Sequence, residues 1–180
     1  MKKNLSILEL CHIGIFAAII VVCAQIAIPL PGGVPMTLQA WGIALAGLVL
    51  GPKNGTLAAL VYVMLGAVGV PVFAHFRGGM GVLLGPTGGF ILSFPLMAFL
   101  AGVGDSKRSM IWVVSGLVAG TIVNWLCGML YFIFITSNSL TVAFTVTVLP
   151  FIPAAIIRTI LLPVISKSIK TELARGGVKI

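Results

Sequence analysis

The sequence predicts an all-α membrane protein in which a bundle of six helices crosses the bilayer. Of its 180 residues, 59% are hydrophobic and only 8% are charged, and the mean hydropathy is +1.22. Soluble domains carry about 25% charged residues, so this composition excludes a soluble globular domain, a disordered chain and a coiled coil. The few charges stand between long apolar stretches, and we therefore expect one integral membrane domain over residues 1–180.

Helix-breaking residues divide the apolar stretches into spans. A crossing helix needs about 20 apolar residues. The prolines and glycines of 29–35, the Gly51-Pro52-Lys53 turn and Pro71 end the first three spans. Polar turns at 105–108 and 136–139 end the next two, and the last begins near Pro150. The expected spans are 7–28, 37–50, 54–70, 88–103, 110–135 and 150–169.

Two segments lie outside these spans. Residues 71–87 form the longest connection, with Arg77, several glycines and two prolines. Residues 140–149 are apolar but too short to cross, so we expect an interfacial or re-entrant piece there.

The basic residues predict the orientation. Six spans put both termini on one side, and nine Lys and Arg residues fall on that side, against Arg77 on the other. Cytoplasmic loops of membrane proteins are enriched in Lys and Arg, so we expect both termini in the cytoplasm and a location in a prokaryotic plasma membrane. Because the basic residues stand singly or in pairs, we expect no nucleic-acid partner. The nine are Lys2, Lys3, Lys53, Lys107, Arg108, Lys167, Lys170, Arg175 and Lys179.

The chain lacks the residues that catalysis or ion coupling would need. It has no Walker A motif, and its three acids, Glu9, Asp105 and Glu172, fall at or beyond the ends of spans. Carriers driven by protons or sodium usually hold the ion with buried acids or broken-helix carbonyls. An enzyme and a self-energised carrier are therefore disfavoured. We expect no cofactor and no metal, because the three cysteines show no metal-binding spacing.

Arg158 and Asn124 are the main candidates for ligand contacts. Arg158 lies about two turns into an otherwise apolar span, where a charge is costly unless it meets a partner. We expect that partner to be an anionic ligand such as a carboxylate; the alternative is an arginine that reaches the outer surface. Asn124 lies mid-span between Gly120 and Gly128. It can contact a polar ligand group or join two helices.

Further candidates are weaker. Tyr131 lies seven residues after Asn124 on the same helical face, and Thr37 and Gln39 begin the second span. Arg77 has no nearby acid and either lines an outward pocket or is a solvated loop charge.

Small residues also mark one helix face. Gly14 and Ala18 form a small-xxx-small pair in the first span, which permits close approach of another helix, internal or from a second subunit.

Five strings of the sequence, taken in order, resemble one family. They are VPMTLQ (34–39), GLVLGPKNG (47–55), LGAVGVPVFA (65–74), RGGMGVLLGPTGGF (77–90) and LPFIPAAIIR (149–158). Together they resemble BioY, the biotin-specific substrate-binding subunit, or S component, of energy-coupling-factor (ECF) vitamin transporters.

The resemblance implies a six-helix S-component bundle with cytoplasmic termini. It also implies partners, namely a transmembrane coupling subunit and two ATPases, which would supply the ATP hydrolysis that this chain cannot perform. In S components a small-xxx-small motif on the first helix meets the coupling subunit, and Gly14 and Ala18 fit that motif.

The last string departs from the family pattern, which usually reads Pro, Gly, Asp, two apolar residues and Lys. Here the Lys has become Arg158 and the Asp has become Ala155. The resemblance therefore implies that Arg158 lacks its usual counter-ion and that the pocket lacks an acceptor for the N–H groups of biotin's ureido ring. Buried, unpaired donors cost about 1–3 kcal/mol each. We expect biotin as the ligand if Asn124 or Gln39 supplies an acceptor; lipoate, or another small carboxylate, is the alternative.

Overall fold

The computed structural model describes residues 5–107 and 109–175. Its first helix, α1 (Ile7–Gln25), begins with a capping box. The Ser6 hydroxyl accepts from the backbone N–H of Glu9 at 3.2 Å, and the Glu9 carboxylate accepts from the N–H of Ser6 at 2.8 Å. The helix ends three residues before the expected boundary at 28, because the next residues pair as a strand.

A small hairpin occupies the region where only an irregular loop was expected. β1 (Ala27–Ile28) pairs antiparallel with β2 (Met36–Thr37), with Ala27 opposite Thr37 and Ile28 opposite Met36. Gly32 and Gly33 have φ values of +98° and +81° in the connecting turn, which a residue with a side chain rarely adopts.

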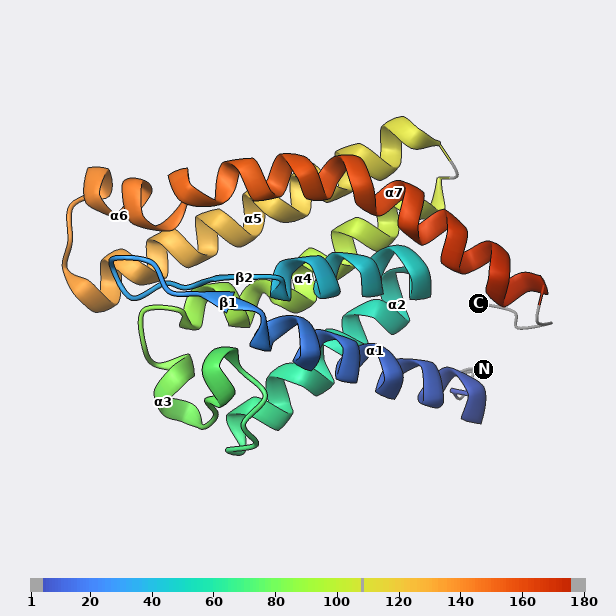
Figure 1. Cartoon of the computed structure of the whole chain (residues 1–180), viewed down its shortest axis with the longest axis horizontal. Helices are drawn as coiled ribbons and strands as arrows, with labels where there is room; N and C mark the ends of the chain where they lie inside the picture. The colour runs from blue at the N-terminus through green and yellow to red at the C-terminus, as the bar shows by residue number, and fades with distance from the viewer. Residues whose placement is uncertain (1–4, 108, 176–180) are drawn as a thin grey trace.

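The second and third expected spans form one helical hairpin, α2 (Gln39–Ala67). Gly51, with φ of +78°, and Pro52 break the helix, so its two halves run back beside each other (Figure 1). The helices pack there so closely that backbone contacts backbone. A β-carbon at Gly55 would lie 2.6 Å from the Cα of Gly47, and one at Gly47 would lie 2.2 Å from the carbonyl oxygen of Ala98. Glycine is therefore required at both positions.

The remaining elements complete the bundle in chain order. The connection after α2 contains two short turns, and the segment expected to be interfacial or re-entrant is a short helix that leads into the last long one. The elements are η1 (Ala74–Phe76), α3 (Met80–Leu83), α4 (Gly88–Ser106), α5 (Met110–Thr136), α6 (Leu140–Thr147), η2 (Leu149–Phe151) and α7 (Ile152–Arg175).

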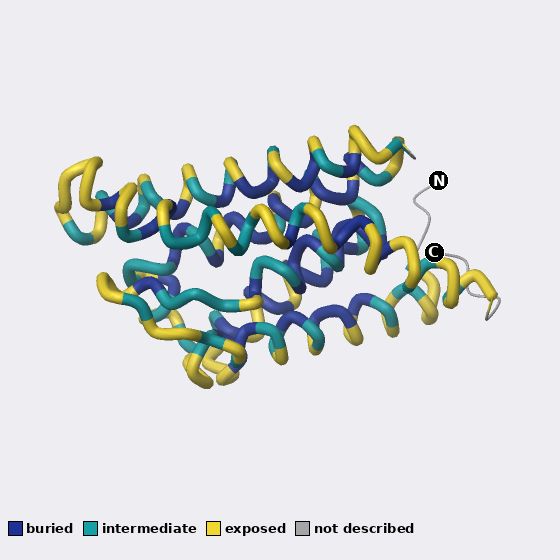
Figure 2. The backbone as a smooth tube through the Cα atoms, turned by 45° about the horizontal axis from the view of Figure 1, so that its top comes forward, coloured by how far each residue is buried: buried dark blue, intermediate teal, exposed yellow. Residues whose placement is uncertain are grey.

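The surface of this bundle is apolar, as a bilayer requires. Buried residues face inward along the long helices and exposed residues face outward (Figure 2). Many outward side chains are large and apolar, among them Ile111, Phe134 and Ile160, which are 77%, 80% and 65% exposed. Five helical stretches of the described residues are long and apolar enough to cross a membrane, with the α2 hairpin counted as one. The predicted fold class, an all-α membrane bundle, is confirmed.

The two described ends of the chain mark one end of the bundle. The first turn of α1 and the last turn of α7 lie at the same end, which we call the terminal end (Figure 1). An ion pair between Asp105 of α4 and Lys170 of α7 joins two helices there. Lys2, Lys3, Arg108 and Lys179, which entered the prediction of orientation, lie outside the described residues.

Candidate ligand-binding site

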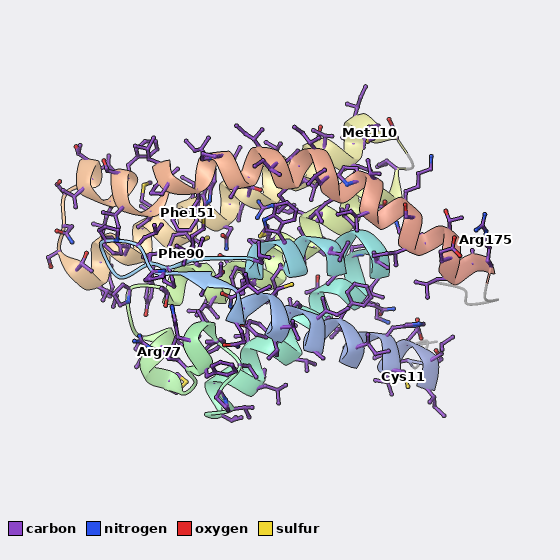
Figure 3. The ribbon with its side chains drawn as sticks, in the orientation of Figure 1. Cys11, Arg77, Phe90, Met110, Phe151 and Arg175 are labelled. Carbon is purple, nitrogen blue, oxygen red and sulfur yellow. The ribbon has the colours of Figure 1, made fainter. Side chains whose placement is uncertain are left out.

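A cavity of about 470 Å³ lies in the half of the bundle away from the terminal end. Its walls come from the β1–β2 hairpin, the start of α2, the 73–87 connection and the facing parts of α4, α5 and α7. Figure 3 shows Arg77, Phe90 and Phe151 in this half, opposite Arg175. The size suits a small-molecule ligand, since such pockets usually measure about 300–1,000 Å³.

Arg158 lies in the wall of this cavity as a buried cation. Its side chain is 5% exposed, and one terminal nitrogen, Nη2, donates to the hydroxyl of Thr121 at 2.5 Å. The Thr121 hydroxyl donates its own hydrogen bond to the carbonyl oxygen of Leu117 at 2.6 Å, so its oxygen is oriented to accept from Arg158. The Nε of Arg158 is buried and has no partner among the described residues. The guanidinium is thus held in place by Thr121 and still has an N–H group that can donate a hydrogen bond to a ligand.

No acid of the chain can neutralise Arg158, because all three are engaged at the terminal end. Glu9 caps α1, Asp105 pairs with Lys170, and Glu172 pairs with Arg175. The cavity wall carries two arginines and none of the three acids, so its charge favours an anion.

Asn124 presents an acceptor to the same cavity. Both N–H groups of its amide point toward α4, one donating to the carbonyl oxygen of Phe90 at 2.9 Å and the other to the hydroxyl of Ser93 at 2.8 Å. The Ser93 hydroxyl in turn donates to Phe90, so it can only accept from Asn124. This network fixes the amide orientation and leaves the oxygen Oδ1 of Asn124 without a protein donor among the described residues.

Gln39 and Thr37 also line the cavity, but they are bonded to each other and to the core. The Gln39 side-chain nitrogen donates to the Tyr62 hydroxyl, and its oxygen accepts from the Thr37 hydroxyl at 3.3 Å. The backbone N–H of Gln39 donates to the Thr37 hydroxyl. Of the two amides considered as ligand acceptors, Asn124 is therefore the one with an uncommitted oxygen.

The other predicted site residues lie in different surroundings. Arg77 is exposed and lines the cavity from the 73–77 turn. Ala155 lines it one helical turn before Arg158. Tyr131 is not among the lining residues; its hydroxyl donates to the carbonyl oxygen of Leu83 at 3.0 Å and supports α3 instead. The structure thus brings together six of the seven predicted side chains.

Sequence reasoning missed several residues of this site. Thr121 orients Arg158, and Ser93 orients Asn124. In the sequence each was marked by a hydroxyl within an apolar run, and Thr121 also by its place one helical turn before Asn124. Aromatic residues outside the 71–90 segment also line the cavity. Other helices contribute Trp41, Phe94, Trp125 and Phe151.

The connection over the cavity is tied to α1 by one side chain. The amide nitrogen of Gln25 donates to the carbonyl oxygens of Val72 and Phe73, both at 3.2 Å, and its oxygen accepts from the N–H of Phe76 at 2.9 Å. His75 and Phe76 both have positive φ, 59° and 54°, an unfavourable conformation for such residues. The two hydrogen bonds that Gln25 donates to this segment and the one that it accepts from it hold this strained turn.

We expect Gln25→Ala to release the 71–79 segment. Each lost hydrogen bond is worth about 1 kcal/mol, so amide exchange of Phe76, measured by hydrogen–deuterium exchange, should rise at least about ten-fold. Gln25→Glu keeps the acceptor for Phe76 and loses the donor, so its exchange should be intermediate. Unchanged exchange in Gln25→Ala would show that the turn is held by other contacts.

The family follows from the whole chain. The model of the BioY family matches residues 1–175. The chain belongs to the BioY family. The biotin transporter BioY of Thermotoga maritima is 42% identical over 163 residues, which cover 90% of this chain and 95% of that protein. The biotin transporter BioY of Rhodobacter capsulatus is 36% identical over 195 aligned residues, covering 98% and 100% of the two chains.

A solved structure agrees with the fold. The crystal structure of an S component for biotin from an ECF-type ABC transporter superposes with a TM-score of 0.84 at 28% identity, and the match covers 95% of each chain. Membership of the BioY family thus rests on sequence and on architecture. Ala155, which stands where the resemblance implies an Asp, lies at the cavity wall.

The small-residue face of α1 is free in this BioY-family chain. Gly14 and Ala18 are exposed, and a β-carbon at Gly14 would meet no atom within 4 Å. The neighbouring Ala17 is only 3% exposed and packs inward. The Gly14–Ala18 face therefore points away from the bundle, and within residues 5–107 and 109–175 no helix packs closely against it.

Proposed function

We propose that the chain is the substrate-binding S component of an ECF-type transporter and that it binds biotin in the cavity at Arg158. The observation that carries this proposal is the buried Arg158 guanidinium, which has no carboxylate within the protein and lines a cavity of ligand size. A ligand carboxylate supplies the missing countercharge through charge-assisted hydrogen bonds. Biotin is favoured because the relatives from Thermotoga maritima and Rhodobacter capsulatus are biotin transporters.

Asn124 takes the role of the acceptor that the family motif assigns to an Asp. Its free oxygen faces the cavity while its N–H groups are held by Phe90 and Ser93. A ureido N–H of biotin can donate to this oxygen. Lipoate remains the alternative ligand, since it shares the carboxylate tail but has no N–H group to satisfy.

Titration of the purified protein with biotin and lipoate tests the proposal. Trp41 and Trp125 line the cavity, whereas Trp112 is 55% exposed and is not among the lining residues. We would follow tryptophan fluorescence in a Trp112→Phe background, which removes the distant signal. Tight biotin binding with weak lipoate binding supports the assignment. Lipoate binding alone would show that the change at Ala155 altered the specificity, and a lack of response to both would exclude both ligands.

Asn124→Ala should separate the two ligands. Loss of the acceptor should weaken biotin by about 1–3 kcal/mol, or roughly 5- to 150-fold in Kd, while lipoate should change less than about three-fold. Isothermal titration of each ligand measures both values. An equal loss for both ligands would mean that the substitution disturbs the α4–α5 packing rather than a specific contact.

The partners and the orientation belong to the same proposal. A transmembrane coupling subunit binds the Gly14–Ala18 face, two ATPases supply the energy, and both termini lie in the cytoplasm. The exposed small-residue face of α1 and the concentration of basic residues at the terminal end support this arrangement. Substrate release then follows a reorientation of the whole subunit against the coupling protein.

Uptake experiments distinguish this function from that of a solitary carrier. Vesicles that contain the chain alone should bind the ligand without accumulating it. Accumulation driven by an ion gradient in those vesicles would contradict the proposal.

A further inference from the structure

A second cavity of about 810 Å³ lies at the terminal end, between the end of α4, the start of α5 and the last part of α7. Figure 3 shows Met110 and Arg175, two of its lining residues, in the half of the molecule opposite to Phe90 and Phe151. This cavity is therefore separate from the candidate ligand-binding site.

The wall of this second cavity is positively charged. Lys167, Lys170 and Arg175 line it together with one acid, Asp105, which leaves a net charge of +2. Asp105 is paired with Lys170, and Arg175 is paired with Glu172. Lys167 is exposed and has no carboxylate partner among the described residues, so its ammonium is available to an anion.

Hydrogen-bonding groups suited to a phosphate accompany these charges. Ser109 and Thr171 place hydroxyls in the lining. The Thr171 hydroxyl donates to the carbonyl oxygen of Lys167 within the helix at 2.9 Å. The Ser109 hydroxyl has no hydrogen bond among the described residues and can donate to a phosphate oxygen.

The surroundings of the cavity indicate a lipid rather than a free ion. Met110 lines it and is 60% exposed, and the adjacent Ile111 and Trp112 are 77% and 55% exposed. On α7, Val164 is 60% exposed just before Lys167 begins the basic segment. The outward apolar surface thus ends where the cations begin. An exposed Trp at this boundary is typical of the depth of the lipid headgroups.

We propose that this cavity binds the phosphate headgroup of an anionic phospholipid, with Lys167 as its main cationic contact and the acyl chains beside Met110 and Val164. Basic pockets between helices at the headgroup level are suited to such lipids. The ligand is chemically a phosphodiester, and its two apolar tails distinguish it from inorganic phosphate.

Lipid retention by the purified chain tests the proposal. We would reconstitute the chain alone in nanodiscs of phosphatidylcholine mixed with phosphatidylglycerol, extract it, and count bound lipids by native mass spectrometry. The wild type should retain phosphatidylglycerol selectively. Lys167→Gln should lower that retention about five-fold, the effect of one cationic residue near an anionic surface.

Lys53→Gln is the matched control. Lys53 is also exposed and follows the α2 kink, but it does not line the cavity. Retention in this variant should equal that of the wild type. An equal loss in Lys53→Gln and Lys167→Gln would overturn the proposal in favour of general surface attraction.

Two further outcomes would also overturn it. The melting temperature should rise with phosphatidylglycerol and not with millimolar inorganic phosphate; an equal rise with both would assign the site to free phosphate. Equal retention of phosphatidylglycerol by the wild type and Lys167→Gln would leave the basic cavity to another anion, such as an acidic segment of a protein partner.

Discussion

Replacing Arg158 by Met should weaken ligand binding at least about 100-fold while leaving the ligand-free protein equally stable or more stable. Removing one partner of a buried ion pair costs about 3–5 kcal/mol of binding, because the ligand carboxylate would enter the cavity without a countercharge. In the empty protein the same guanidinium is buried and its Nε has no partner among the described residues. Loss of that unpaired charge should therefore not lower the melting temperature.

Two control variants sharpen this experiment. Arg158→Lys keeps the charge but loses the planar guanidinium, which can donate two parallel hydrogen bonds to a carboxylate. Its affinity for the ligand should therefore lie between those of the wild type and Arg158→Met. Arg77→Ala removes an exposed cation of the same cavity and should reduce binding far less. The measurements are tryptophan fluorescence titration and thermal unfolding of each purified variant. Normal affinity in Arg158→Met would remove Arg158 from the site.

Placing Leu at both Gly14 and Ala18 should abolish assembly with the coupling subunit and spare ligand binding. Both residues are exposed and no atom lies within 4 Å of a β-carbon at Gly14, so the bundle itself can accommodate the added bulk. A partner helix that approaches this face closely cannot accommodate it. The cavity residues lie on other elements, so the Kd for the ligand should change less than about two-fold.

Copurification of the coupling subunit and the ATPases with the tagged chain measures this effect. The matched control is Ser115→Leu, which enlarges another exposed small residue, on α5. It should assemble normally. Complex formation by the Gly14→Leu/Ala18→Leu protein at wild-type yield would contradict the proposed interface.

The fold was predictable because apolar length and helix breakers are local properties of the sequence. The Gly51-Pro52 turn correctly separated two antiparallel helices, which the structure joins in one hairpin. The β1–β2 pair was not foreseen, since strands of two residues carry no periodicity. The end of α1 was placed three residues too late for the same reason.

The lining of the candidate site was predictable only where a polar side chain stood out in an apolar run. Arg158 and Asn124 met that condition, and both line the cavity. The hydrogen bond from Arg158 to Thr121 joins residues 37 positions apart, and Gln25 contacts a turn about 50 positions away. Such contacts depend on how the helices pack against one another, and no local sequence pattern predicts that packing. Tyr131 shares a helical face with Asn124, but it is two turns farther along and meets α3.

The glycine contacts of the α2 hairpin have a consequence for how substrate specificity can diverge. At Gly47 and Gly55 the backbones themselves touch, so these positions admit no side chain and set the spacing of the helices. The residues that line the cavity, such as Ala155, lie in the half of the bundle away from the terminal end and take no part in those contacts. We therefore expect a substitution at Ala155 to alter the shape of the cavity without a compensating change in the packing of the scaffold.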